Sequence, residues 1–180
     1  YTVGGIPMNE RIAICPGSFD PVTMGHLDII RRASVLFDKV IVLVVVNPVK
    51  NTSFTPEERV ELIRKSVEGI PNVEVDLYMG LLVDYVRSKG AVAIVKGLRA
   101  LSDFEYEFQM ALINKKMLPY AETIFLTTAA NYQYLSSSLV KNVATFGGDI
   151  SDLVPRAIHD EVVARLGNAD MAKLGKEALM

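Results

Sequence analysis

The sequence predicts a single doubly wound α/β domain built on a five-stranded parallel sheet, and three observations lead to that fold class. Short apolar runs rich in β-branched residues recur five times along the 180 residues. Segments with the apolar spacing of helices separate these runs. The runs are also apolar throughout rather than alternating, which is typical of strands covered by helices on both faces of a parallel sheet.

The expected strands are residues 12–15, 40–46, 73–77, 91–95 and 123–126. The helix after the second strand has a clear start, because Thr55 can cap it, Pro56 suits its first position and Glu58 completes a capping box. A further helix is expected from about residue 155 to residue 166. We expect residues 1–8 to be an appended or disordered extension, residues 9–167 to form the domain, and residues 168–180 to form a helical tail.

The composition is that of one soluble globular domain. Half of the residues are hydrophobic, 22% are charged, and 19 Lys and Arg stand against 21 Asp and Glu, a net charge of −2. This balance gives no general electrostatic reason to expect nucleic acid or an acidic membrane as partner. The single cysteine, Cys15, excludes an internal disulfide and a multi-cysteine zinc site. No apolar run reaches the roughly 20 residues of a membrane span, and no export signal is evident, so we expect a cytoplasmic protein.

Polar and cationic residues follow four of the five expected strands. The first strand leads to Pro-Gly-Ser-Phe-Asp-Pro at residues 16–21, the second to Lys50, the fourth to residues 96–99 with Lys96 and Arg99, and the fifth to the serines at 136–138. Ligands of open α/β sheets bind beyond the carboxyl ends of the strands, where these groups should converge. Hydroxyls, helix N-termini and cations together suit a polyphosphate, hence a nucleotide. Neither a Walker loop nor a dinucleotide fingerprint is present, so the phosphate-binding solution is a different one.

These same segments carry a family resemblance. Residues 16–21 followed by Thr23-Met24-Gly25-His26 resemble the T/H-x-G-H signature of the nucleotidyltransferase superfamily, and Leu-Ser-Ser-Ser-Leu-Val-Lys at 135–141 resembles its second motif. Lys-Gly-Leu-Arg at 96–99, with Asp-Phe-Glu-Tyr-Glu at 103–107, is similar to the bacterial phosphopantetheine adenylyltransferase family. The similarity runs from about Arg11 to Leu166. It implies a Rossmann-like fold and transfer of the adenylyl group of ATP to 4′-phosphopantetheine, giving dephospho-coenzyme A and pyrophosphate, the penultimate step of coenzyme A biosynthesis.

The resemblance also implies roles for individual residues. His26 would contact the α-phosphate and stabilise the transition state, and Ser18 would contact phosphate between the two substrates. Lys50 and Lys96 would neutralise the phosphate of 4′-phosphopantetheine, and Arg99 would contact the leaving phosphates. His26, Ser18, Lys50 and Arg99 would thus form the catalytic set. Lys96 departs from the family pattern, in which Arg is frequent, so a point charge replaces a bidentate fork.

The remaining implied contacts complete the two substrate sites. Leu82 would line the pantetheine arm, and Glu107 would contact the adenosine side. The ATP site would be completed by Phe19, Gly97, Leu98, Tyr132, Ser136, Ser137 and Ser138. Mg²⁺ is expected to be held mainly by substrate phosphates, so no protein ligand to the metal is named. The family resemblance further implies a homohexamer and coenzyme A as a feedback ligand.

The residue types suit this reaction. A phosphate oxygen is already ionised near neutral pH, so the acceptor needs no general base and no covalent protein nucleophile. What remains is to hold two anions together and to stabilise charge at the α-phosphorus and on departing pyrophosphate. Neither a Ser-His-Asp triad nor a carboxylate cluster for two metals stands out in the sequence, which fits that division of labour.

Other interpretations stay open at this point. The acceptor could be nicotinamide mononucleotide or glycerol phosphate, or the chain could be a nucleotide sensor without catalysis. Taken singly, His26 could simply cap its helix, and Ser136 is expected to be an ordinary helix cap. Cys15 is expected in the core, although its closeness to the phosphate loop suggests alkylation as a route to inhibition.

Overall fold

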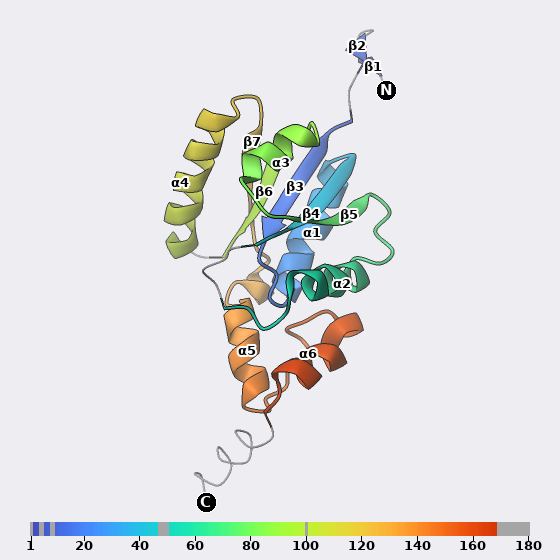
Figure 1. The fold of residues 1–180 in the computed structure, drawn as a ribbon, viewed down its shortest axis with the longest axis vertical. Coiled ribbons are helices and arrows are strands. Elements are labelled where there is room, and N and C mark those ends of the chain that lie inside the picture. Colours follow the sequence, from blue (N-terminus) through green and yellow to red (C-terminus); the bar gives the residue numbers. More distant parts are fainter. Residues whose placement is uncertain (1, 4–5, 8–9, 47–50, 100, 169–180) are drawn as a thin grey trace, which may run out of the picture.

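A computed structural model describes residues 2–3, 6–7, 10–46, 51–99 and 101–168 of the chain. Five parallel strands form its main sheet: β3 (Ile12–Gly17), β4 (Lys39–Val45), β5 (Val73–Tyr78), β6 (Ala93–Leu98) and β7 (Glu122–Thr127). All five predicted strands are confirmed, each with at least one end at a different residue. Two further short strands, β1 (Thr2–Val3) and β2 (Ile6–Pro7), pair antiparallel and lie away from this sheet (Figure 1).

Helices follow the strands of the sheet. They are α1 (Met24–Leu36), α2 (Pro56–Ser66), α3 (Leu82–Ser88), α4 (Leu101–Met117), α5 (Ser137–Thr145) and α6 (His159–Leu166), with 3-10 turns η1 (Ala130–Tyr132) and η2 (Arg156–Ile158). Thr55 and Glu58 form the predicted capping box of α2. Within the described residues no helix is both long and apolar enough to cross a bilayer. Most of the predicted tail, residues 169–180, lies outside the described residues.

The sheet is buried on both faces. Successive side chains of a strand point to opposite faces, and helices cover each face. Ala13, Cys15 and Val42 face one core, to which α1, α2, α5 and α6 contribute. Ile14 and Leu43, in alternate positions of the same strands, face a second core with α3 and the residues that follow α4. This two-sided burial is the physical reason for the unbroken apolar runs in the sequence.

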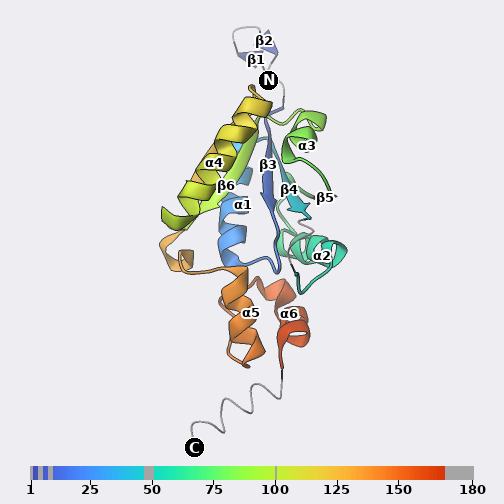
Figure 2. The ribbon, with the colours of Figure 1, turned by 60° about the vertical axis from the view of Figure 1, so that its left-hand side comes forward.

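The strand order is β5-β4-β3-β6-β7, so the chain reverses its direction of winding between β3 and β6. At that position consecutive connections leave toward opposite faces, and the general rule for such sheets places the binding crevice beyond the carboxyl ends of β3 and β6. Helices α5 and α6 lie beyond this end of the sheet, below it in Figures 1 and 2. The crevice is therefore bordered by the loop after β3, the exit of β6 and the start of α5.

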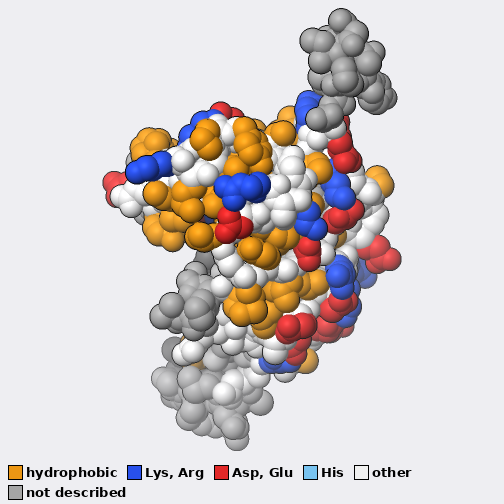
Figure 3. Space-filling view, turned by 45° about the horizontal axis from the view of Figure 1, so that its top comes forward, with side chains coloured by type: hydrophobic (Ala, Val, Ile, Leu, Met, Phe, Trp, Pro, Cys, Tyr) orange, Lys and Arg blue, Asp and Glu red, His pale blue; other side chains and the backbone are white. Residues whose placement is uncertain are grey.

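Helix α4 differs from the others because much of its apolar surface is exposed. Tyr106 is 65% exposed and Leu112 is 56% exposed, and other large apolar side chains of the helix share this exposure: Phe104, Phe108, Met110, Ile113 and Met117. Figure 3 shows hydrophobic side chains gathered on the side of the molecule where α4 lies. The helix thus packs one side on the sheet and leaves an unusually apolar outer surface.

Candidate active site

The loop that leaves β3 owes its shape to two neighbouring residues. A Cβ atom at Gly17 would lie 2.9 Å from the ring of Phe19, so only glycine leaves room for that ring. Phe19 itself has φ of +48°, a left-handed conformation that costs energy for a bulky residue. Its buried ring meets His26 edge-on, with 5.1 Å between ring centroids. The loop therefore turns back on itself to place an aromatic ring directly against the histidine.

Helix α1 begins at the far end of this loop, and its cap holds His26. Thr23 is the N-cap, and its hydroxyl accepts the backbone N–H of His26 at 3.3 Å. In return the backbone N–H of Thr23 donates to Nδ1 of His26 at 3.0 Å. Because Nδ1 accepts this bond, the proton of the neutral imidazole lies on Nε2. The histidine therefore caps its helix and also has Nε2–H available as a donor.

Two cations act on His26 from the exit of β6. Burial, together with the positive charges of Arg99 and Lys96, lowers the pKa of His26 to about 4. The imidazole is consequently neutral near pH 7. The structure thus brings His26, which follows the first predicted strand, near Lys96 and Arg99, which follow the fourth.

Lys96 already has an anionic partner in this structure. Its Nζ lies 3.1 Å from Oε2 of Glu107 on α4, and both side chains are only about a quarter exposed, at 24% and 21%. The two residues were expected to contact different substrates. The ion pair thus places Lys96, which was expected at the phosphate of 4′-phosphopantetheine, next to Glu107, which was expected at the adenosine of ATP.

Arg99 links the exit of β6 to the segment before α5. Its Nε and Nη2 each donate to the Asp103 carboxylate at 2.9 Å, and Nη1 donates to the carbonyl of Leu135 at 3.1 Å. A planar guanidinium held on two sides in this way has a defined orientation. Arg99 is therefore oriented before any ligand arrives.

The start of α5 docks on the loop after β3. Ser136 is the N-cap and accepts the N–H of Leu139 at 3.0 Å, as the capping interpretation expected. The Ser137 hydroxyl donates to the carbonyl of Pro21 at 2.8 Å. Ser138, one position further, is exposed. The serine run and the loop that carries Ser18 are thus in direct contact.

The other predicted residues take varied positions. Gly97 lies where α1 crosses β6 closely, since a Cβ there would be 2.8 Å from Cγ1 of Ile29. The carbonyl of Leu98 accepts the N–H of Thr128, and Tyr132 packs against the first core beside Gly25. Leu82 packs against the second core, and no contact ties it to His26 within the described part of the chain. Lys50 lies outside the described residues.

Cys15 corrects one expectation. The side chain is buried, with 4% of its surface exposed, and burial raises the pKa of the thiol to about 12. A buried thiol that stays protonated is a poor nucleophile. Cys15 is therefore a core residue, and alkylation at this position is not a route to inhibition of the folded protein.

Sequence reasoning missed three side chains that shape the site. The guanidinium of Arg59, a buried residue of α2, donates to the carbonyl of Ser18 at 2.8 Å. Asp20 is buried and pairs with Lys141 of α5. Asp20 lies in the first recognised motif and Lys141 ends the second, but neither was assigned a role; Arg59 lies in no motif, and only the fold brings it near Ser18.

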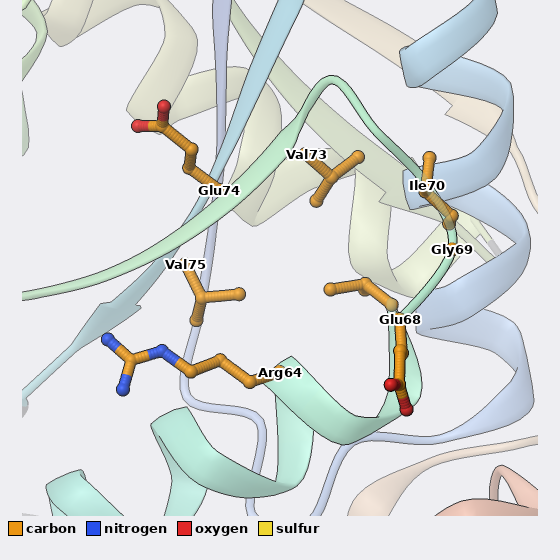
Figure 4. A pocket seen from close by; sticks show the side chains of 8 residues that line it. Arg64, Glu68, Gly69, Ile70, Val73, Glu74 and Val75 are labelled. Atoms are coloured by element: carbon orange, nitrogen blue, oxygen red, sulfur yellow. The ribbon is translucent and has the colours of Figure 1, made fainter.

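A depression of about 500 Å³ on another part of the surface is unrelated to this crevice. It lies between the end of α2 and the first residues of β5, and Arg64, Glu68 and Val73 are among the residues that line it (Figure 4). The depression therefore lies at the edge strand β5, near the amino end of that strand. The position where the strand order reverses remains the candidate active site.

The fold and this site define the chain as a nucleotidyltransferase of the Rossmann-like class. The cytidylyltransferase-like family model matches residues 14–143. A Vibrio parahaemolyticus protein assigned as a nicotinate-nucleotide adenylyltransferase has a similar structure, with a TM-score of 0.65 at 20% identity, covering 88% of this chain and 99% of that one. At that identity the likeness extends to the fold alone.

Closer relatives identify the particular family. The phosphopantetheine adenylyltransferase of Caldanaerobacter subterraneus is 57% identical over 86% of this chain and 97% of its own length. That of Heliobacterium modesticaldum is 54% identical over 90% and 96%. That of Alkaliphilus metalliredigens is 58% identical over 82% and 94%. The chain belongs to the phosphopantetheine adenylyltransferase family.

Proposed function

We propose that the protein catalyses transfer of the adenylyl group of ATP to 4′-phosphopantetheine in the crevice between β3 and β6, giving dephospho-coenzyme A and pyrophosphate. The observation that carries this proposal is a neutral histidine, His26, placed beside the cations Lys96 and Arg99. An oxygen of the acceptor phosphate forms a bond to the α-phosphorus of ATP, and the bond from that phosphorus to the oxygen bridging to the β-phosphate breaks. Pyrophosphate leaves with the electron pair of that bond.

His26 acts in this scheme as a hydrogen-bond donor. Its Nδ1 is occupied by the N–H of Thr23, so Nε2–H is the atom that meets an α-phosphate oxygen. Charge grows on that oxygen in the transition state, and a fixed donor in a partly buried site stabilises it. Ser18, whose carbonyl is held by Arg59, would contact phosphate from the same side.

The two cations would divide the remaining charge. Lys96 meets the phosphate of 4′-phosphopantetheine, and together with Lys50 it reduces the repulsion between that anion and ATP. Arg99, oriented by Asp103 and the Leu135 carbonyl, contacts the leaving phosphates. When the substrates bind, Glu107 would release Lys96 and contact the adenosine side instead.

The nucleotide would be enclosed by segments that already touch. The N-terminus of α5 offers the unpaired N–H groups of a helix start to the terminal phosphates. Tyr132 lies beside Gly25 and Phe19 meets His26, both in the first turn of α1, and Gly97 allows β6 and α1 to approach closely. Four residues complete the proposed contacts: Leu98, Ser136, Ser137 and Ser138. Leu82, at the exit of β5, would contact the pantetheine arm.

Mg²⁺ fits this site as a partner of the nucleotide. Among the residues the structure describes, no group of three or more metal-binding side chains is assembled. The crevice presents cations and hydroxyls, so phosphate oxygens and water would be the ligands of the metal. When bound, the ion would neutralise charge on the leaving pyrophosphate.

Assembly and location extend the same proposal. The exposed apolar surface of α4 supports a homo-oligomer, because an apolar surface of this kind is typical of subunit interfaces. We assign the state as a hexamer from the family resemblance, with coenzyme A as a feedback ligand and the cytoplasm as the location.

A pyrophosphate-release assay tests the proposed reaction. The protein is incubated with ATP, Mg²⁺ and one phosphate acceptor at a time: 4′-phosphopantetheine, nicotinamide mononucleotide or glycerol phosphate, with CTP replacing ATP in parallel. Release only with ATP and 4′-phosphopantetheine is the expected result. Release with another acceptor would reassign the substrate, and tight ATP binding without release in any mixture would favour a sensor.

A further inference from the structure

Asp20 is a buried carboxylate at the meeting point of three segments. It is 5% exposed and lies in the loop after β3, two residues beyond Ser18. Its Oδ1 accepts the backbone N–H groups of Ser53 at 3.1 Å and of Phe54 at 3.0 Å, and its Oδ2 accepts the N–H of Ser53 at 3.0 Å. Oδ2 also accepts a hydrogen bond from the ammonium group of Lys141 in α5.

The partners of Asp20 lie far away in sequence. Ser53 is 33 residues downstream and Lys141 is 121 residues downstream, so this carboxylate joins the loop after β3 to the segment before α2 and to α5. A second bond, from the Ser137 hydroxyl to the Pro21 carbonyl, joins α5 to the same loop. The position of the serines at the start of α5 relative to Ser18 is therefore fixed by groups that need not touch a ligand themselves.

The charge of Asp20 is important for this arrangement. Two backbone N–H groups and an ammonium group converge on one carboxylate, and hydrogen bonds to charged groups are the stronger kind. Replacing Asp20 by a neutral group leaves Lys141, whose side chain is 27% exposed, without its anion. The start of α5 would then be attached to the loop mainly through Ser137.

We propose that Asp20, acting through Lys141 and the N–H groups of Ser53 and Phe54, is a positioning residue for adenylyl transfer that sets the separation between the loop of Ser18 and the start of α5. The inference rests on the proposed function, in which ATP phosphates bind between these two segments. A displacement of about 1 Å of a positioning group can cost on the order of 10²-fold in rate.

Lys141→Met removes one partner and keeps the apolar stem. Lys141→Arg keeps the charge. Lys39→Met is the matched control, because Lys39 has the same 27% exposed side chain and an ion pair with Glu74 at 2.6 Å, at the opposite end of the sheet. Pyrophosphate release gives kcat and both KM values, calorimetry gives the ATP affinity, and circular dichroism confirms folding at the assay temperature.

Lys141→Met is expected to lower kcat by about 10- to 100-fold and to weaken ATP binding, whereas Lys141→Arg and Lys39→Met stay within about threefold of wild type. Asp20→Asn should give the same pattern, and the double variant Asp20→Asn with Lys141→Met should lose no more than the worse single variant, since both act through one contact. Wild-type kcat, KM and ATP affinity in folded Lys141→Met would overturn the inference, as would equal losses in Lys39→Met. An inactive wild-type protein would instead contradict the proposed function, and the ATP affinities would still report on positioning.

Discussion

The backbone N–H of Thr23 donates to Nδ1 of His26 at 3.0 Å, and this bond determines which nitrogen of the imidazole can act on a ligand. Helix capping and the proposed catalytic role are thus two uses of one side chain. The cap fixes the ring and its tautomer, and the ring of Phe19 packs against it edge-on. The histidine is presented as an oriented neutral donor, a form suited to an oxygen that gains negative charge.

Removal of this donor should slow the reaction. We expect His26→Ala to lower kcat on the order of 10²–10³-fold, as for loss of one transition-state donor, with a smaller effect on folding because Thr23 still caps the helix. Steady-state pyrophosphate release and thermal unfolding measure the two effects. A variant with wild-type turnover would remove His26 from the mechanism.

The pKa of His26 makes stability depend on pH. The pKa is lowered to about 4 in the folded protein from an ordinary value of 6.5, chiefly by burial. Between these values the unfolded chain binds a proton that the folded chain does not, so the contribution of His26 is complete above pH 6.5 and is lost as the pH falls toward 4. Urea unfolding at pH 7.5 and pH 5 should show a larger loss for wild type than for His26→Gln. Equal losses would show that His26 titrates normally.

Lys96 and Glu107 should affect different substrates. We expect Lys96→Met to raise the KM for 4′-phosphopantetheine about 10- to 100-fold, the loss of one charge-assisted hydrogen bond, while Lys39→Met leaves it unchanged. Glu107→Gln neutralises the group assigned to the adenosine side, so it should raise the KM for ATP; it also frees Lys96 from its ion pair, so the KM for 4′-phosphopantetheine should not rise. Equal changes in both KM values for either variant would contradict this division.

Cys15 should be inert in the folded protein. Because burial raises the pKa of its thiol to about 12, iodoacetamide at pH 8 should label the chain only after denaturation. Mass spectrometry of native and urea-treated samples makes the comparison. Rapid labelling of the native protein with loss of activity would restore the alkylation route.

The close approach of β6 and α1 should make Gly97 intolerant of a side chain. We expect Gly97→Ala to lower the free energy of unfolding by about 1–3 kcal/mol, since the new Cβ would meet Cγ1 of Ile29 at 2.8 Å. Gly25→Ala is the control, because its nearest neighbour would be at 3.5 Å. Denaturant unfolding measures both, and adding Ile29→Ala should relieve part of the Gly97→Ala loss. Fully additive losses would exclude this contact as the cause.

The sequence by itself determined the strands, the class of fold and the position of the candidate site. Those properties depend on near neighbours: an apolar run long enough for a buried strand, the Thr55 and Glu58 capping box, and motifs placed directly after strands. The order in which the strands pair is not among these properties, because doubly wound parallel sheets take more than one strand order. For these reasons the sequence alone predicts a candidate site at the carboxyl ends of the strands.

Only the tertiary structure decided how the side chains of the site are held and charged. The ion pair of Lys96 with Glu107, the contact of Asp20 with Lys141 and the bond from Arg59 to the Ser18 carbonyl join residues from different elements. The pKa values of His26 and Cys15 depend on burial, which local sequence does not define. Electrostatic interactions depend on distances in space rather than along the chain, so folding decides which groups become partners.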